Sequence, residues 1–318
     1  RAQSTVKTQI AYSSAAQIGL MFIEVALGFH WLVLIHFAGN AFLRTYQLLV
    51  SPSVLNYLVH HQYFHYTPPE QKPVSKIKAT LYMLGIREWN LDSMMFTYVW
   101  SPFKWLGKQL QFLHSKFISA FLILTAIVLL LLGYAYPGII SSTGGILPVI
   151  LMGIALAVIL FAFSCRQSAL QAWVYLLTGN LFIMVAVLYN APHINPIEII
   201  FYASGVLIAF LIGYYCLQKI NAIDRDISLD KFHGYVYEQE NTGLLFLFAA
   251  IGMLGFPVTA AFIGIDVLFT YVHSNQIVLI ILMALCLIFI ELSAFRILLR
   301  IFMGPHKKLN HPVAFRSS

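Results

Sequence analysis

Long apolar stretches alternate with shorter polar ones along most of the chain. Eight of the apolar stretches have the roughly 20 residues that an α-helix needs to cross a hydrocarbon core of about 30 Å. They lie at about residues 9–28, 30–50, 117–136, 146–164, 168–190, 197–217, 242–272 and 276–302. The pattern predicts an all-α fold, a polytopic bundle of transmembrane helices that crosses the bilayer about eight times.

The composition agrees with the pattern and excludes several other classes. Of the 318 residues, 60% are hydrophobic and only 10% are charged, which is typical of membrane proteins. The three cysteines are far apart and form no CxxC pair, so we expect no metal site. The sequence contains no P-loop, no GxGxxG and no nucleophile elbow, so we expect no cofactor and no enzymatic activity in this chain. The chain begins at Arg1 without a signal-peptide pattern, as is typical of the middle of a larger polytopic chain.

The positions of Lys and Arg predict the orientation in the membrane. If eight spans alternate, every Lys and Arg outside a span falls on the side of Lys7, together with segments 51–116 and 218–241 and the C-terminal tail. The opposite loops contain no Lys or Arg; they lie around residues 29, 136–145, 189–196 and 271–276. The positive-inside rule makes the basic side cytoplasmic. We therefore expect a multi-pass protein of the cell membrane, the inner membrane of a bacterium, and the net charge of +7 needs no nucleic acid as partner.

Two of the expected cytoplasmic segments are too long to be simple connections. In the first, Pro52 and the prolines near residue 70 predict a broken chain, and residues 90–116 have the pattern of an amphipathic helix that lies on the membrane surface. The second, at 218–241, is rich in charge, and we expect it to be mobile or covered by a partner. Segments 51–78 and 224–240 are the predicted docking surfaces for a soluble protein.

Ionisable groups inside a membrane are costly, so those present are candidates for function. The second span carries His36, Asn40 and Arg44 at spacing i, i+4 and i+8, on one helix face over about 12 Å. The first span adds Gln17 and Glu24. The alternative is that Arg44 reaches the cytoplasmic interface while His36 and Asn40 only link helices by hydrogen bonds.

The seventh span has a proline near its middle. Gly255 and Pro257 together predict an interrupted helix, and interrupted helices are where transporters bind ions. Asp266 follows the break and is a candidate for an ion pathway. The alternative is a packing kink with Asp266 near the outer interface.

Glu291, in the last span, is the remaining ion-pathway candidate. It lies near the middle of the span, whereas Arg296 and Arg300 approach the cytoplasmic end. Glu291 either pairs with one of these arginines or faces the seventh span. If the two carboxylates belong to one pathway, Asp266 and Glu291 must meet.

Four stretches of the sequence resemble a known family. Residues 1–22, RAQSTVKTQIAYSSAAQIGLMF, resemble the KxxxAYSxxxQxG run of proton-translocating antiporter-like subunits, notably the L subunit of respiratory complex I and the large Mrp antiporter subunit. Residues 36–44, HFAGNAFLR, resemble the HxxxHAFFK motif of this family. Residues 90–113 resemble the link before the long lateral helix of the L subunit, and residues 254–266, LGFPVTAAFIGID, resemble the broken-helix motif GxPxxxGFxSKD.

The family motifs place different side chains at three positions. Asn40 stands at the second histidine, Arg44 at the lysine of the first motif and Ile265 at the lysine of the second. Arginine does not lose its proton in proteins, so Arg44 sets the local field and does not relay a proton. Titratable relay roles then fall to His36, Glu24, Asp266 and Glu291.

The combination HxxxNAxLRxxQLLxSPS with GFPxTxxFIGxD is most similar to the DabB-like proteins. The resemblance implies a subunit that conducts H⁺ or Na⁺ and energises a DabA-like zinc protein in the uptake of inorganic carbon. The alternatives are a subunit of a complex I, Mrp or hydrogenase-type assembly and a structural scaffold that does not conduct. The corresponding division is an antiporter-like two-span segment at 1–50, a cytoplasmic or interfacial segment at 51–116, and a six-span segment at 117–318 with the broken helix near 255–257.

Overall fold

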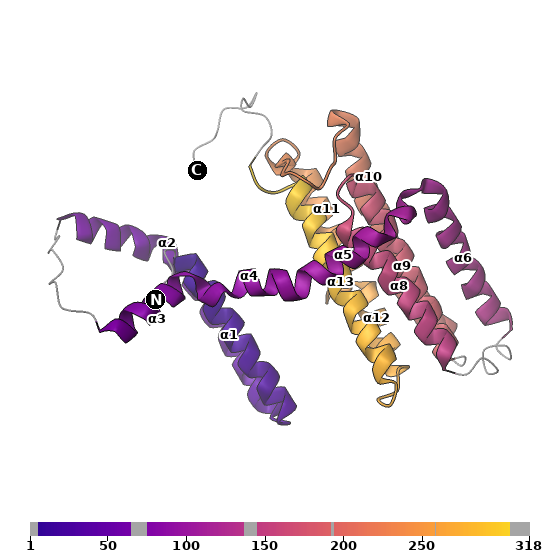
Figure 1. The fold of residues 1–318 in the computed structure, drawn as a ribbon, viewed down its shortest axis with the longest axis horizontal. Coiled ribbons are helices and arrows are strands. Elements are labelled where there is room, and N and C mark those ends of the chain that lie inside the picture. Colours follow the sequence, from indigo (N-terminus) through magenta and orange to yellow (C-terminus); the bar gives the residue numbers. More distant parts are fainter. Residues whose placement is uncertain (1–5, 65–74, 137–144, 192–193, 258, 306–318) are drawn as a thin grey trace. The chain divides into compact units, whose positions relative to one another are not determined.

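The computed structural model describes residues 6–64, 75–136, 145–191, 194–257 and 259–305 (Figure 1). All regular secondary structure in these ranges is helical, which confirms the predicted all-α fold. The chain divides into two compact units, residues 1–97 and residues 98–318. Each unit is described by itself below.

The N-terminal unit is built on a pair of contacting long helices, α1 and α2. Its helices are α1 (Val6–Ala26), α2 (His30–Phe64), α3 (Lys76–Ile86), η1 (Glu88–Asn90) and α4 (Leu91–Met95). Apolar side chains cover the outside of the pair; Trp31 and Phe42 are each 79% exposed. These two helices therefore direct their apolar side chains outward, as helices in contact with lipid or with other membrane helices do.

The second helix does not end where the proline pattern predicted. Proline at position 52 has no N–H to give to the carbonyl of Leu48, four residues earlier. The hydroxyl of Ser51 donates a hydrogen bond to that carbonyl at 3.3 Å. A serine hydroxyl can thus replace the missing donor, and α2 continues to Phe64, well past the predicted end at residue 50. The prolines near residue 70 lie outside the described residues.

The C-terminal unit is a bundle of long helices. After η2 (Phe96–Trp100), at the border of the units, it contains α5 (Ser101–Gln109), η3 (Leu110–His114), α6 (Lys116–Ala135), α8 (Ile146–Ser164), α9 (Ala169–Asn190), α10 (Pro196–Asp224), η4 (Tyr235–Tyr237), α11 (Glu240–Met253), α12 (Ala260–Thr270) and α13 (Ile277–Ile301). In the described part of the chain, five helices are long and apolar enough to cross a membrane: α6, α8, α9, α10 and α13. The polytopic bundle is confirmed, whereas the count of eight crossings stays a prediction.

The predicted surface helix at 90–116 is helical over almost all of its described length, as a series of short helices. Its central piece, α5, packs against α8 and runs across it in Figure 1. Trp100 and Phe103 contact the ring of Phe289 on α13, with centroids 6.4 and 4.8 Å away. Trp100 and Phe103 therefore pack on the bundle, whereas Trp105 and Phe112 of the same segment are 60% and 63% exposed.

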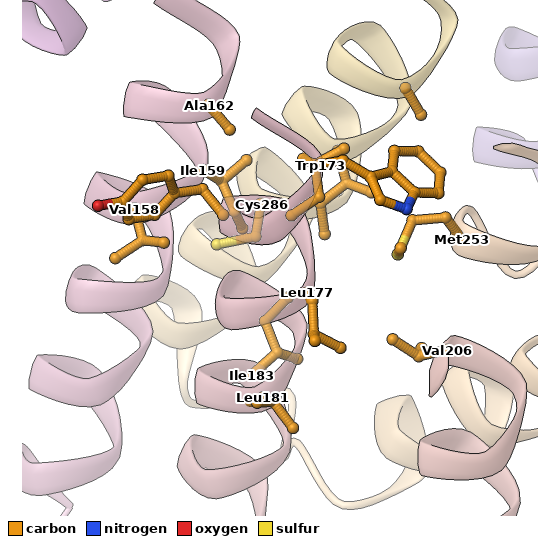
Figure 2. Packing of buried hydrophobic residues seen from close by; sticks show 14 of the residues in the cluster. Val158, Ile159, Ala162, Trp173, Leu177, Leu181, Ile183, Val206, Met253 and Cys286 are labelled. Carbon is orange, nitrogen blue, oxygen red and sulfur yellow. The ribbon is translucent and has the colours of Figure 1, made fainter. Parts of the chain in front are cut away.

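The core of the C-terminal unit is centred on α9. This helix contacts α6, α8, α10 and α13, and nearly all of its side chains are buried. Figure 2 shows the packing around it, with Val158, Ile159, Ala162, Trp173, Leu177, Leu181, Ile183, Val206, Met253 and Cys286 labelled. By contrast, about half of the side chains of α6 are exposed, because α9 is its main contact among the long helices.

The polar segment at 218–241 does not project from the bundle. Helix α10 continues to Asp224, and the chain after it packs back against the bundle. The N–H groups of Leu229, His233 and Val236 donate hydrogen bonds to the carbonyls of Arg166, Arg300 and Phe302 at 2.7, 2.8 and 2.9 Å. The charge-rich pattern predicted a mobile or partner-covered loop because it did not show that Leu229 and Tyr235 are buried.

Candidate functional site

A polar seam runs between α1 and α2. Glu24 and Gln17 on α1 face His36 on α2, whose side chain is 22% exposed. His36 Nδ1 lies 2.9 and 3.1 Å from the two carboxylate oxygens of Glu24, and Nε2 lies 2.6 Å from Oε1 of Gln17. Both ring nitrogens are thus engaged by side chains of the first helix.

A second cluster continues the seam around Arg44. Its Nε donates to Asn40 Oδ1 at 3.1 Å, one terminal nitrogen donates to Gln47 Oε1 at 2.6 Å, and the other donates to Ser13 Oγ at 2.6 Å. All three partners are neutral. They fix the direction of the guanidinium group without neutralising its charge.

The spacing of the residues on each helix explains why they meet. Ser13, Gln17 and Glu24 recur at intervals of four and seven residues, which places them on one face of α1. His36, Asn40 and Arg44, spaced by four residues, share one face of α2. The two helices form an antiparallel hairpin joined by a short turn. Hence Glu24 meets His36 near the turn, while Ser13 meets Arg44 two turns of helix away.

A pocket of about 360 Å³ opens beside Arg44. Its lining residues come from the start of α1 and the middle of α2: Val6, Gln9, Ile10, Ser13, Arg44, Tyr46, Gln47, Val50 and Ser51. Arg44 therefore lies between this pocket and the pair formed by His36 and Glu24. The seam has polar groups along its length and an opening at the Arg44 end.

The hydrogen-bond partners of His36 indicate which of its ring nitrogens donates. With Gln17 Oε1 as the acceptor, as the structure assigns it, Nε2 of His36 donates the hydrogen bond. A hydrogen bond between Nδ1 and Glu24 then needs one further proton, held either by the ring or by the carboxyl group. Moving that proton converts an imidazolium–carboxylate pair into a neutral pair without moving a heavy atom.

The structure places Asp266 and Glu291 differently from the expectation. Both side chains are exposed on the C-terminal unit, and neither forms a hydrogen bond or an ion pair with a residue in the described ranges. Helix α12 packs mainly against α10, whereas α13 packs against α8, α9 and α11. The two carboxylates are therefore not brought together.

Arg296 and Arg300, the possible partners of Glu291, are engaged elsewhere. Arg296 donates to the carbonyls of Phe163 and Cys165 at the end of α8, the second at 2.9 Å. The guanidinium of Arg300 lies 4.3 Å from the ring centroid of Phe232. Cations at the end of a helix are favoured by the unpaired carbonyls there, which explains the position of Arg296.

The chain is interrupted where Gly255 and Pro257 predicted a break. Helix α11 ends at Met253, α12 begins at Ala260, and Gly255 has φ +64°, a conformation that side chains other than glycine rarely adopt. A buried polar pair lies next to the break. The hydroxyl of Tyr202 donates to Asn180 Oδ1 at 2.5 Å, and Nδ2 of Asn180 lies 3.5 Å from Sδ of Met253.

Sequence reasoning missed several of these polar residues. Ser13 and Gln47 were not selected, although Gln47 is three residues from Arg44 and so is on its face of α2. Asn180 was also missed. Its signal was present in the sequence, since Thr178 and Asn180 interrupt the otherwise apolar middle of α9.

Comparison with known proteins identifies the class of the N-terminal part. Residues 1–86 match the family described as "NADH:quinone oxidoreductase/Mrp antiporter, TM", and this range contains both clusters of the seam. The resemblance predicted from residues 1–22 and 36–44 is thereby confirmed. The chain is a multi-pass membrane protein with an antiporter-like N-terminal segment.

A curated relative is more specific. It is the "Probable inorganic carbon transporter subunit DabB2" of Halothiobacillus neapolitanus, 38% identical over 56 residues, which is 18% of this chain and 10% of the relative. The match thus spans about a tenth of that protein. No solved structure matches the chain.

Proposed function

We propose that the chain is a proton-conducting membrane subunit that energises a partner protein. The role supported best is that of a DabB-like subunit in a complex for the uptake of inorganic carbon, as CO2 or bicarbonate, with a DabA-like zinc protein as the partner. The antiporter-like match of residues 1–86 and the similarity to the named transporter subunit support this role. Chemical or redox steps belong to partner chains.

The observation that carries the proposal is the contact of His36 with Glu24 at 2.9 Å inside an α1–α2 seam. The contact places two side chains that can each carry a proton within hydrogen-bond distance, as a relay requires. An imidazole nitrogen is a poor ligand for Na⁺, which prefers oxygen, so this site favours H⁺ over Na⁺ as the conducted ion.

Arg44 gives the seam a permanent positive charge. Its neutral partners, Asn40, Gln47 and Ser13, leave that charge to act along the seam. In the proposed mechanism Arg44 sets the field of the seam without carrying a proton itself, and the pocket beside it is the opening of the pathway.

The proposed pathway thus uses Glu24, His36, Asn40 and Arg44. Asp266 and Glu291, predicted on the same pathway, stay predictions that the described contacts do not support. The break at Gly255 and Pro257, with the buried Asn180 next to it, is a second place where an ion would find polar groups.

Proton flux in native membrane vesicles tests the proposal. With the complete complex and a pH-sensitive dye, Glu24→Gln should abolish gradient-driven proton movement, and His36→Ala should impair it more than Asn40→Ala. Thr45→Val is the matched control, because Thr45 neighbours Arg44 and its hydroxyl donates to the carbonyl of Ala41 in the same helix. Unchanged flux in Glu24→Gln vesicles would exclude the relay.

Arg44 supports a second candidate function, a scaffold subunit that does not conduct. Arginine at the position of the family lysine cannot exchange a proton. If this interpretation is right, vesicles with the wild-type chain and vesicles with the Glu24→Gln variant show the same proton flux. The wild-type chain and the variant then both keep the complex assembled. A third interpretation, a subunit of a complex I, Mrp or hydrogenase-type assembly, is distinguished by copurification of iron–sulfur and flavin subunits in place of a zinc protein.

The proposed orientation places segment 218–241 in the cytoplasm and loop 271–276 outside. Cysteine labelling tests it, because the native cysteines are buried. A membrane-impermeant maleimide added to intact cells should modify Asn275→Cys and leave Tyr237→Cys unmodified. The opposite result would invert the orientation.

A further inference from the structure

Glu291 is in an unusual environment for a carboxylate. It lies ten residues before Ile301, the end of α13, which corresponds to about 15 Å along the helix and so to the middle of a hydrocarbon core. Its side chain is exposed on the surface of the C-terminal unit and has no hydrogen bond or ion pair with any described residue. Lipid tails offer it no donor, and a charged group at this depth costs several kcal/mol.

The residues around Glu291 form a regular stripe along α13. The stripe repeats at alternating intervals of four and three residues: Ile277, Ile281, Ala284, Ile288 and Glu291. The next position in this register, Phe295, is partly buried against the core and ends the stripe. Ile277, Ile281 and Ile288 are 63%, 54% and 47% exposed. This spacing is the a/d repeat by which one helix packs along another in a left-handed pair.

The opposite side of α13 has its own apolar stripe, which is already used. Leu279, Met283, Cys286, Ile290 and Ala294 are buried in the core of the unit. Helix α13 thus has two surfaces suited to helix packing. One is filled by the bundle, and the other, which contains the carboxylate, is not covered by any described helix of the C-terminal unit.

We infer that the uncovered stripe binds a transmembrane helix of another subunit, and that a Lys or Arg of that helix pairs with Glu291. The apolar positions provide the packing surface, and the cation supplies the charge that Glu291 lacks. The helices should cross at about 20°. The inference goes beyond the proposed function, because it concerns what covers α13 and not what the α1–α2 seam conducts.

Charge disfavours a symmetric pair of copies of this chain along the stripe. Two copies in one membrane have the same orientation, so a symmetric pair along this stripe would place Glu291 opposite Glu291 near the middle of the bilayer. Two like charges in a medium of low dielectric constant repel strongly. A helix with a cation at the same depth removes the repulsion and neutralises the carboxylate.

Site-specific photo-crosslinking in native membranes tests the occupant. A photoreactive residue at position 281 or 288 of the full-length protein, expressed with its complex, should crosslink to another polypeptide. Mass spectrometry should place the crosslink in an apolar segment of about 20 residues that contains Lys or Arg. Leu124, 60% exposed on α6 outside the stripe, is the control position and should give lipid adducts. Lipid adducts alone at 281 and 288, products between two copies of this chain, or products within one copy would overturn the inference.

Reversal of charge tests the pairing itself. Glu291→Lys should lower the crosslink yield from position 288 by about tenfold or more, because it places two cations together. Exchange of the partner's cation for Glu should restore the yield. If the Glu291→Lys variant does not accumulate, Glu291→Gln replaces it in the experiment, because glutamine keeps the shape of the side chain. Its crosslink yield should lie between those of the wild type and of Glu291→Lys. Wild-type yield in both variants would show that no cation faces Glu291.

Discussion

The two units of this protein place their polar residues in opposite ways. In the α1–α2 pair, ionisable side chains face each other across the seam, and large apolar side chains such as Phe42 point outward. In the C-terminal bundle the core around α9 is mainly apolar, with Asn180 as a buried polar exception, and the carboxylates Asp266 and Glu291 point outward. The first arrangement brings together groups that can exchange a proton. The second leaves charged groups for contacts with something outside the bundle.

The contrast also concerns what holds each unit together. Lipid is as apolar as a leucine side chain, so close packing and hydrogen bonds, and not removal from water, stabilise helix contacts in a membrane. The C-terminal unit has extensive close packing. The α1–α2 pair has mainly its polar seam, so substitutions of the same type should have different effects in the two units.

The largest difference between the two units is expected in the free energy of unfolding when a tryptophan is replaced by alanine. Trp173→Ala on the fully buried α9 should lower the free energy of unfolding by about 3 kcal/mol, because it leaves a large cavity and removes the hydrogen bond from Nε1 to the carbonyl of Phe210. Trp31→Ala, at a side chain 79% exposed, should change it by less than about 0.5 kcal/mol. Unfolding in mixed detergent micelles, followed by circular dichroism, measures both. Equal losses would mean that the α1–α2 pair is covered as completely as α9.

Glycine substitutions should give the next largest difference. A Cβ atom at Gly264 would lie 2.4 Å from Cβ and 2.5 Å from Cα of Tyr202, so Gly264→Ala should force α12 away from α10 and cost about 2 kcal/mol. At Gly39 on α2 the added Cβ would meet no atom of another described residue within 4 Å. Gly39→Ala should therefore be neutral or stabilise the helix by up to about 1 kcal/mol. The same unfolding assay applies, and a stable Gly264→Ala variant would contradict the close approach of α10 and α12.

A smaller effect is expected at the buried polar pair beside the helix break. Tyr202→Phe removes the donor to Asn180 Oδ1 and leaves that oxygen buried, at a cost of about 1 kcal/mol. Tyr215→Phe is the control, because Tyr215 is 61% exposed on the same helix. If both variants unfold alike, the Tyr202 hydroxyl contributes nothing to the bundle.

The smallest effect is expected outside the membrane. Lys231 Nζ lies 2.5 Å from Asp226 Oδ2, and this contact holds the pKa of the Asp226 carboxyl well below its usual range. A lowered carboxylate pKa stabilises the folded state above the ordinary value of about 3.9, and the contribution disappears as the pH falls toward the folded-state pKa. Because the pair is partly exposed, it should contribute less than about 1 kcal/mol. Proteolysis of segment 225–239 should accelerate slightly below about pH 4 in the wild type but not in Asp226→Asn.

Helix periodicity explains which parts of the site could be predicted. The spacing of His36, Asn40 and Arg44 showed that they share a face, since side chains four residues apart lie above one another on a helix. It did not show that Ser13, Gln17 and Glu24 are their partners, because contacts between helices depend on the turn and on the relative rotation of the two helices. The same limit explains Asp266 and Glu291. Sequence placed both at membrane depth, but α12 and α13 are apolar on nearly every side, so their pattern does not show which side faces the bundle.

Composition and the local preferences of the backbone were enough to predict the all-α membrane class, the positions of the long apolar helices and the interruption at Gly255. The motifs of the first fifty residues were enough to predict the resemblance to antiporter-like subunits. Three features were visible only in the structure: α2 continues past residue 52, segment 225–239 packs on the bundle, and Glu291 lies on a stripe that no described helix of its unit covers. Each of these depends on contacts between groups distant in sequence or on a single hydrogen bond, such as that of Ser51, which no pattern of apolar and polar positions contains.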